Sequence, residues 1–179
     1  RLLRRMREIG IGSYDEYCNY LRENYDEEIE NLINCITTNK TEFFRESEHF
    51  SILQKIVEQE LSHKNIAVWS AGCSTGEEAY SIAIVLLESK FNKNFKILAT
   101  DIDSKVLEIA RMGVYPIDAV QTIDINMLKK YFLKGKEQYA GYAKVKDFLK
   151  KNISFQHINL LDNNYRLRGY FDIIFCRNV

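Results

Sequence analysis

The chain has 179 residues, of which 46% are apolar and 28% are charged, and its 25 basic side chains balance its 25 acidic ones. This composition predicts one globular domain, or one domain plus a small appendage, and argues against disorder. No stretch approaches the roughly 18 consecutive apolar residues of a membrane-spanning helix, so we expect a soluble, cytoplasmic protein without direct membrane insertion. The widely spaced cysteines and histidines predict neither a metal site nor a disulfide framework.

The balanced total hides three charged segments. Arg1–Ile9 has a net charge of +3, Tyr14–Glu30 of −6 and Lys129–Lys151 of +6. Such segregation indicates that separate faces meet separate polar partners. For the two basic segments, a solvated surface without a partner is the alternative.

Every periodic segment of the first 63 residues is predicted to be a helix. Ser13 is placed to cap a helix over residues 14–24, and a stripe of Ile29, Leu32, Ile33 and Ile36 indicates a second helix. A further helix is expected over residues 48–62. We therefore expect a small all-α domain over residues 1–63.

Strand and helix patterns alternate from residue 64 onward. Residues 66–71 and 95–100 have the apolar character of buried strands, and helices are expected after Gly76 and over residues 104–112, the latter ended by Gly113. This alternation predicts right-handed βαβ crossovers and an α/β domain with a parallel sheet.

The second half of the chain contains an irregular stretch and two more strands. Residues 116–151 are expected to form a small inserted subdomain with a helix and short antiparallel strands. The strand pattern resumes at residues 153–158 and 170–176, the second run suiting a strand covered on both faces. Because a doubly wound sheet seldom ends on an interior strand, we expect the domain over residues 64–179 to be truncated after its fourth strand.

The turn after the first predicted strand is a candidate ligand site. Gly72 and Gly76 allow a tight turn and a close approach to a ligand, and the following helix directs free N–H groups to the same place. Glu77 and Glu78 would repel a pyrophosphate, so a neutral or cationic ligand fits better than a dinucleotide. The alternative is structural, since each glutamate stands three residues after a hydroxyl side chain, which is the spacing of a capping box.

Polar residues also follow the other predicted strands. Asp101 ends the second strand, where an acid commonly accepts hydrogen bonds from ribose hydroxyls, while Asp103 is expected to cap the next helix. Asn159, Arg177 and Asn178 follow the later strands. Because the carboxyl ends of parallel strands line one crevice, we expect these side chains to meet there.

The segment over residues 37–46, TTNKTEFFRE, matches the stripe of neither neighbouring helix. Its two phenylalanines would anchor a polar junction that carries asparagine, threonine and arginine side chains. Taken alone, the segment is typical of a helix cap and linker in which Arg45 forms an ordinary salt bridge.

Five blocks of sequence together resemble the CheR-type chemotaxis receptor methyltransferases. They are TTNKTEFFRE (37–46), VWSAGCSTGEEAYSIA (68–83), ATDID (99–103), NLL (159–161) and FDIIFCRNV (171–179). The resemblance implies a basic helical domain followed by a Rossmann-like class I methyltransferase domain with an inserted β-subdomain. It further implies that S-adenosylmethionine is the cofactor and that glutamate side chains in the cytoplasmic domain of methyl-accepting chemotaxis receptors are the substrate, with no role for nucleic acid.

The resemblance also implies roles for individual residues. Arg45 would be the catalytic residue, facing the transferable methyl group and the incoming glutamate, and Asp101 would hold the ribose. The basic face with Arg4, Arg5 and Arg7 would meet acidic receptor helices. The residues implied around the cofactor are Asn39, Thr41, Arg45, Glu78, Asp101, Asn159, Leu160, Arg177 and Asn178.

Other functions remain open at this point. The domain could bind S-adenosylmethionine as a non-catalytic sensor or scaffold, or it could methylate a small molecule or RNA. A dinucleotide oxidoreductase ranks last, because the first turn lacks the GxGxxG pattern. Members of the family continue past CRNV with an IYF segment whose tyrosine lies near the reacting groups, and its absence here puts catalysis by this fragment in question.

Overall fold

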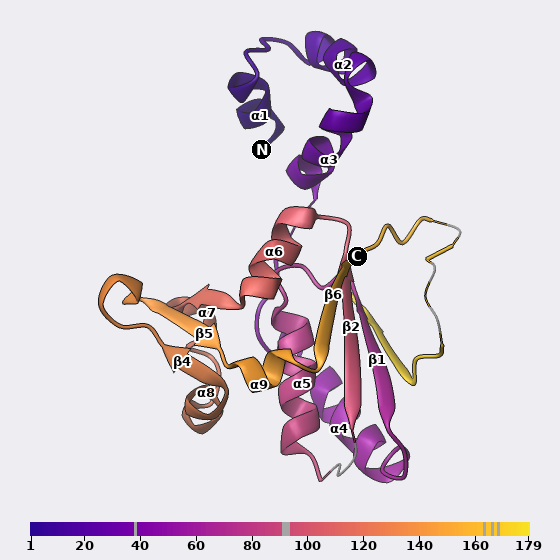
Figure 1. Ribbon diagram of the computed structural model, residues 1–179, viewed down its shortest axis with the longest axis vertical. Helices are drawn as coiled ribbons and strands as arrows, with labels where there is room; N and C mark the ends of the chain where they lie inside the picture. The colour runs from indigo at the N-terminus through magenta and orange to yellow at the C-terminus, as the bar shows by residue number, and fades with distance from the viewer. Residues whose placement is uncertain (38, 91–93, 163, 166, 168) are drawn as a thin grey trace.

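A computed structural model of the chain describes residues 1–37, 39–90, 94–162, 164, 165, 167 and 169–179. A parallel sheet packed against helices forms the larger body, a group of helices lies at one end, and a small antiparallel sheet projects from the side (Figure 1). The predicted α/β architecture with a preceding all-α unit is confirmed. Among the described residues, no helix combines the length and the apolar character needed to cross a bilayer.

The helical unit at the N-terminus consists of α1 (Leu2–Glu8), α2 (Tyr14–Glu23) and α3 (Tyr25–Ile36). The predicted cap of α2 is confirmed, because Ser13 Oγ accepts the backbone N–H of Glu16 at 3.2 Å. This bond satisfies one of the N–H groups that a helix N-terminus leaves without a partner inside the helix.

A buried ion pair joins the three helices of this unit. Glu28 on α3, only 1% exposed, accepts hydrogen bonds from Arg5 Nε at 2.9 Å and from Arg5 Nη2 at 2.5 Å. The hydroxyl of Tyr17 on α2 donates to the same carboxylate at 2.9 Å. The hydrogen bond from the Arg5 guanidinium is the main reason that the pKa of Glu28 lies below its ordinary value.

Arg5→Ala should therefore destabilise the protein by about 3 kcal/mol, because it leaves the Glu28 carboxylate buried without its cation. Since the pKa of Glu28 is lower in the folded state, the pair's contribution is fully present above the unfolded value of about 4.3 and is lost as the pH falls through the folded value. Urea unfolding followed by circular dichroism measures both effects.

Arg4→Ala is the matched control. Arg4 forms an i,i+4 pair with Glu8, but its side chain is 86% exposed, so its loss should cost less than about 0.5 kcal/mol. Equal losses from the two substitutions would show that the Arg5–Glu28 pair does not hold the unit together.

Helix α4 (Glu48–Gln59) lies with the larger body and not with α1–α3. Its buried side chains Phe50, Leu53 and Val57 join the core that includes α5 (Glu77–Glu88). Both α3 and α4 have an apolar stripe, and a stripe alone does not say which partner it covers. We therefore propose that the boundary between the two parts lies near residue 37 rather than after residue 63.

The four strands of the main sheet lie in the order β6-β2-β1-β7, and the neighbouring strands are parallel. Ala71 pairs with both Thr100 and Cys176, and Asp101 pairs with His157, so the four carboxyl ends meet at one edge. The chain adds β2 and β6 on one side of β1 and β7 on the other, which places the topological switch point at the end of β1. The strands are β1 (Ile66–Ala71), β2 (Phe95–Asp101), β6 (Ile153–His157) and β7 (Ile173–Cys176).

Helices α5 and α6 (Ser104–Met112) lie on one side of this sheet, and the described residues of the segment between β6 and β7 lie on the other (Figure 1). The predicted bounds of α6 are confirmed, and Gly113 ends it in the left-handed conformation with φ of 60°. The prediction for the last strand was wrong in part. β7 begins at Ile173 rather than at residue 170, and Ile174 is 56% exposed instead of covered.

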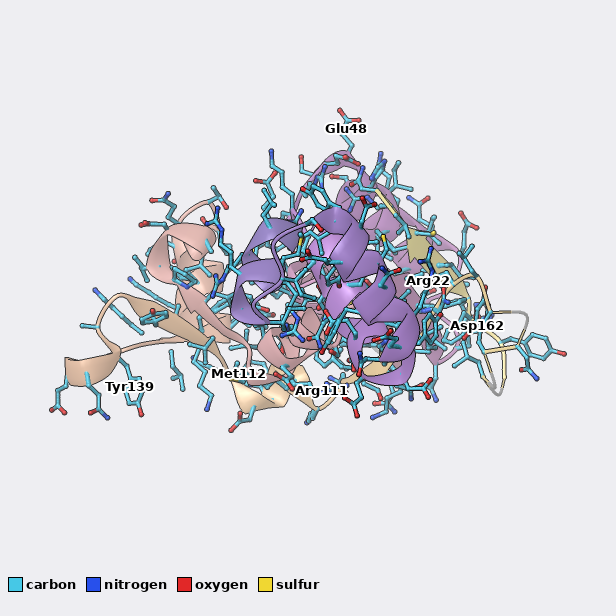
Figure 2. The ribbon with its side chains drawn as sticks, turned by 90° about the horizontal axis from the view of Figure 1, so that it is seen from above. Arg22, Glu48, Arg111, Met112, Tyr139 and Asp162 are labelled. Atoms are coloured by element: carbon cyan, nitrogen blue, oxygen red, sulfur yellow. The ribbon has the colours of Figure 1, made fainter. Side chains whose placement is uncertain are left out.

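The projecting subdomain contains an antiparallel sheet in the order β3-β5-β4. Figure 2 shows Tyr139 at its tip, far from Asp162, which lies on the segment between β6 and β7. The short helices α7 (Ile117–Val120) and α8 (Ile125–Tyr131) belong to the subdomain, and α9 (Asp147–Lys150) leads from it to β6. Its strands and 3-10 turn are β3 (Val114–Pro116), β4 (Phe132–Lys134), η1 (Glu137–Tyr139) and β5 (Tyr142–Val145).

Candidate functional site

A cavity of about 560 Å³ lies at the edge where the four strands end. Its walls come from the linker after α3, the turn after β1, and the loops after β2, β6 and β7. The structure thus brings together side chains that are up to 142 positions apart in the sequence, from Thr37 to Val179. All nine residues that the resemblance assigns to the cofactor line this cavity: Asn39, Thr41, Arg45, Glu78, Asp101, Asn159, Leu160, Arg177 and Asn178.

The turn after β1 owes its shape to left-handed backbone conformations. Gly72, Ser74 and Gly76 have φ values of 81°, 48° and 97°. A Cβ atom at Gly76 would also lie 2.8 Å from the Cβ atom of Ala110 on α6, so glycine allows the two helices to approach closely here. The glycines of this turn are therefore required by the backbone conformation and by helix packing, apart from any role in ligand binding.

The capping-box alternative is wrong for both glutamates that follow this turn. The N-cap residue of α5 is Gly76, which has no side chain to form a cap, so neither Ser74 nor Thr75 occupies that position. Glu77 is buried and accepts the Thr75 hydroxyl at 2.6 Å, and only Glu78 of the pair lines the cavity. The two acids therefore do not act together, and one carboxylate faces the ligand space.

The two aspartates after β2 have different partners, as predicted. Asp103 Oδ1 accepts the N–H groups of Lys105 and Val106 and so caps α6. Asp101 lines the cavity, where its two oxygens accept the backbone N–H groups of Ser74 at 2.7 Å and of Asp103 at 3.0 Å. A carboxylate oxygen can accept more than one bond, so Asp101 keeps acceptor sites for hydroxyl groups of a ligand.

The linker that carries Arg45 is anchored by its two phenylalanines, as predicted. Phe43 is 3% exposed and packs edge-on against the rings of Tyr115 and Phe132, with centroid distances of 5.0 and 5.4 Å. Phe44 packs edge-on against Phe50 at 5.5 Å. These contacts tie the linker to the inserted subdomain and to α4.

Backbone contacts on both sides hold Arg45 at the cavity. The N–H of Phe44 donates to Ser81 Oγ at 3.0 Å, and the carbonyl of Arg45 accepts Arg177 Nη2 at 2.7 Å. Phe44 and Glu46 have φ values of 55° and 56°, a strained conformation that persists only where surrounding contacts enforce it. The guanidinium of Arg45 donates to the Lys40 carbonyl at 2.8 Å, and its Nε lies 3.9 Å from Glu46 Oε1 in a long ion pair. A guanidinium has five N–H donors, so its fork retains donors for a carboxylate.

Arg177 lines the cavity, but its hydrogen bonds go to protein groups. Its guanidinium contacts Glu78 Oε2 at 3.2 Å and Glu46 Oε2 at 2.8 Å, and it lies 5.8 Å from the ring centroid of Phe50. Together with its bond to the Arg45 carbonyl, these contacts tie the linker to α5. Arg177 therefore organises the wall that presents Arg45 and Glu78.

Glu78 is a largely buried carboxylate with two kinds of partner. Its Oε1 accepts the hydroxyl of Ser70 at 2.7 Å and its Oε2 faces Arg177. Burial raises the pKa of Glu78, while the Ser70 hydrogen bond and the Arg177 charge oppose that rise. A further positive group in the cavity would favour the ionised form.

The loops after β6 and β7 hold the remaining predicted residues in defined turns. Asn159 Oδ1 accepts the N–H of Leu161 at 3.0 Å, and the Leu160 carbonyl accepts the Tyr165 hydroxyl at 2.6 Å. Asn178 adopts a φ of 55°. Asn159, Leu160 and Asn178 all line the cavity, so these loops form part of its wall.

Sequence reasoning missed the apolar part of the cavity. Phe50, Ile102 and Ile158 line it, and so does Thr37. Phe50 belongs to the stripe of α4, and the two isoleucines follow buried strands, so all three had the pattern of core residues. The only available signal was their position beside the polar residues at the strand ends.

The three N-terminal arginines do not share one face. Arg4 and Arg7 are exposed, whereas Arg5 turns inward to Glu28. Successive side chains of a helix point about 100° apart, so Arg5 does not lie on the same face as its neighbour Arg4. The grouping of Arg5 with the exposed basic face was therefore wrong.

Comparisons with known proteins agree with this arrangement. Residues 39–179 match the family model "CheR methyltransferase, SAM binding domain", and residues 1–37 match "CheR methyltransferase, all-alpha domain". The chain is 43% identical to chemotaxis protein methyltransferase 2 of Pseudomonas aeruginosa and 41% identical to the chemotaxis protein methyltransferase of Salmonella typhimurium, over all of its length. It is 42% identical to the chemotaxis protein methyltransferase of Borreliella burgdorferi over 95% of its length. The chain spans 65%, 62% and 63% of these three relatives.

Proposed function

This chain belongs to the CheR methyltransferase family, and from that premise we propose that the protein transfers a methyl group from S-adenosylmethionine to the side-chain carboxylate of glutamate residues in chemotaxis receptors. The observation that carries the proposal is the cavity at the strand ends, which gathers Arg45, Glu78 and Asp101. The product would be a glutamyl methyl ester on the cytoplasmic domain of the receptor, which places the reaction in the cytoplasm.

The side chains around the cavity fit this cofactor. Asp101 offers carboxylate acceptors for ribose hydroxyls, and Glu78 offers a negative charge for the positive groups of the methionine part. The apolar side chains of Phe50, Ile102 and Ile158 suit an aromatic base. The family model matched by residues 39–179 is named for the same cofactor.

The proposed chemistry requires alignment more than proton transfer. When bound, the cofactor supplies an activated methyl group on a positively charged sulfur atom. A glutamate carboxylate is already ionised at pH 7, so no general base is required of the protein. Holding the reacting groups in line can contribute up to roughly 7–11 kcal/mol in favourable systems.

Arg45 suits the task of holding the incoming carboxylate. A guanidinium binds a carboxylate through paired hydrogen bonds, and the contacts on either side of Arg45 fix its backbone at the rim of the cavity. Only contacts that strengthen during transfer raise kcat, so this pairing must improve as the carboxylate approaches the methyl group.

Two measurements on the full-length protein test the proposal. Calorimetry should detect binding of S-adenosylhomocysteine, and a tritiated-methyl assay should label glutamates of receptor cytoplasmic fragments. Binding without labelling would support a sensor or scaffold instead. Labelling of RNA in place of the receptor would contradict the proposed substrate.

The exposed basic face of α1 is proposed to steer the protein to acidic receptor helices. Replacing Arg4 and Arg7 by Glu should lower kcat/KM for receptor methylation by about 10-fold at low salt, and the difference should shrink as salt screens the charges. A matched control makes the same change of charge at the exposed residues Lys55 and Lys96, which lie on other elements. Equal effects from both double variants would show that net charge alone matters and that the α1 face has no specific role.

A further inference from the structure

Asp103 has a second set of partners beyond the helix that it caps. The residue is 2% exposed, and its Oδ2 accepts the hydroxyl of Thr37 at 3.0 Å and the side-chain amide of Asn39 at 2.7 Å. Both donors come from the linker after α3, more than 60 residues away in the chain. Burying a carboxylate costs free energy unless its oxygens accept hydrogen bonds. The bonds from Thr37 and Asn39 therefore offset the cost of burying Asp103.

The bonds of Asp103 connect the helical unit with the cofactor cavity. Thr37 is the C-cap residue that directly follows α3, and Asn39 lines the cavity. On the other side, the backbone N–H of Asp103 donates to Asp101 Oδ1 at 3.0 Å. One side chain therefore contacts the end of the helical unit and one wall of the cavity, and its backbone contacts the carboxylate proposed to hold the ribose.

We propose that Asp103 is a positioning residue that couples cofactor binding to the docking of the linker and the helical unit. The inference rests on the proposed function, because it concerns the same cavity. By accepting the amide N–H of Asn39, Asp103 fixes the orientation of that side chain and leaves its carbonyl oxygen as the acceptor for a ligand. Because coupling is reciprocal, a bound cofactor stabilises the docked linker to the same extent that the docked linker strengthens cofactor binding.

Asp103→Asn separates this role from helix capping. Asparagine caps helices about as well as aspartate, so the bonds to the start of α6 survive through Oδ1. The second oxygen becomes an NH₂ group, which cannot accept the bonds that Thr37 and Asn39 donate. To bond with this NH₂ group, the Asn39 amide would have to flip, which takes its carbonyl oxygen away from the ligand. The substitution therefore removes the linker contacts selectively.

Asp124→Asn is the matched control. Asp124 caps α8 in the same way, since its Oδ1 accepts the N–H groups of Asn126 at 2.8 Å and Met127 at 3.2 Å. It lies in the inserted subdomain and does not line the cavity. Thr37→Val provides a milder variant, because it removes one donor and keeps both the charge of Asp103 and the bond from Asn39.

The experiment combines calorimetry with hydrogen exchange on the full-length protein, using S-adenosylhomocysteine as the probe. Asp103→Asn should raise the Kd about 10-fold, Thr37→Val a few-fold and Asp124→Asn less than about twofold. In the wild type and in Asp124→Asn, the probe should protect backbone amides of residues 39–46 from exchange. In Asp103→Asn, this protection should be lost even at saturating probe.

The outcomes distinguish this inference from the proposal on which it rests. A purely structural role for Asp103 would lower thermal stability yet leave the protection of residues 39–46 at saturation, and that result would overturn the inference. So would Kd values for Asp103→Asn and Thr37→Val that match Asp124→Asn. Failure of the wild type to bind the probe would instead overturn the proposed cofactor site itself.

Discussion

Arg45→Ala should reduce methyl transfer to receptor fragments by about 10²–10³-fold, because it removes the guanidinium proposed to hold the incoming carboxylate in line. Binding of S-adenosylhomocysteine should survive in large part, since Asp101, Glu78 and the apolar wall remain. The kcat from a tritiated-methyl assay and the Kd from calorimetry separate the two effects.

Arg45→Lys refines this test. Lysine retains the positive charge but lacks the planar fork that binds a carboxylate through two parallel hydrogen bonds. If orientation is the main contribution of Arg45, the lysine variant should remain severely impaired. Turnover close to the wild-type rate in Arg45→Ala would refute the assignment, and full recovery in Arg45→Lys would show that charge alone suffices.

Arg177→Ala should impair stability, cofactor binding and turnover together. Its side chain is 12% exposed, and its guanidinium contacts two carboxylates and the Arg45 carbonyl, so its removal frees the linker and leaves the largely buried Glu78 without a cation. We expect a loss of about 3 kcal/mol in the free energy of unfolding and at least a 10-fold weaker binding of S-adenosylhomocysteine. Urea unfolding and calorimetry measure these two quantities.

The pH dependence of binding gives a sharper test of the Arg177–Glu78 contact. Burial raises the pKa of Glu78, so its carboxylate becomes protonated at a higher pH than an ordinary glutamate, whose pKa is about 4.3. As the pH is lowered, cofactor binding should therefore begin to weaken while the pH is still above that value. Arg177→Ala removes a charge that lowers this pKa, so the loss of binding should move to higher pH. The effect of Glu78 on folding stability depends on pH in the opposite direction. Because its pKa is higher in the folded state than in the unfolded state, the protonated form of Glu78 favours folding, and this contribution is lost as the pH rises through the folded-state pKa.

Lys64→Ala is the control for both measurements. Lys64 pairs with Asp172, but its side chain is 45% exposed and it does not line the cavity. Its loss should cost less than about 1 kcal/mol and should leave the pH dependence of binding unchanged. A shift of the same size in both variants would rule out a specific role for the Arg177–Glu78 pair.

Much of the fold could be predicted because local sequence signals and the tertiary structure agree. The apolar runs at residues 66–71 and 95–100 predicted strands that the structure has at Ile66–Ala71 and Phe95–Asp101, and Asp103 and Gly113 mark the start and the end of α6. The last strand was predicted less well. A continuous apolar run indicates a strand, but it does not show how many residues pair or whether both faces are covered.

The candidate site was predictable to the extent that its residues carry polar chemistry at the ends of strands. The alternation of strands and helices is enough to place Asp101, Asn159 and Arg177 at one edge of a parallel sheet. The linker is different, since Arg45 belongs to no strand and was assigned only through a resemblance of sequence blocks. Its contacts with Ser81 and Arg177 depend on which helices pack together.

The sequence by itself determined the succession of helices and strands, the parallel sheet and the identity of the polar residues at its edge, because periodicity, caps and turns are local properties. Only the tertiary structure decided that α4 packs with the larger body, that Arg5 pairs with Glu28 inside the helical unit and that Asp103 binds the linker. The sequence shows that an apolar stripe must be covered and that a buried charge must be paired. It does not show which residues cover or pair them, because those contacts join residues far apart in the chain.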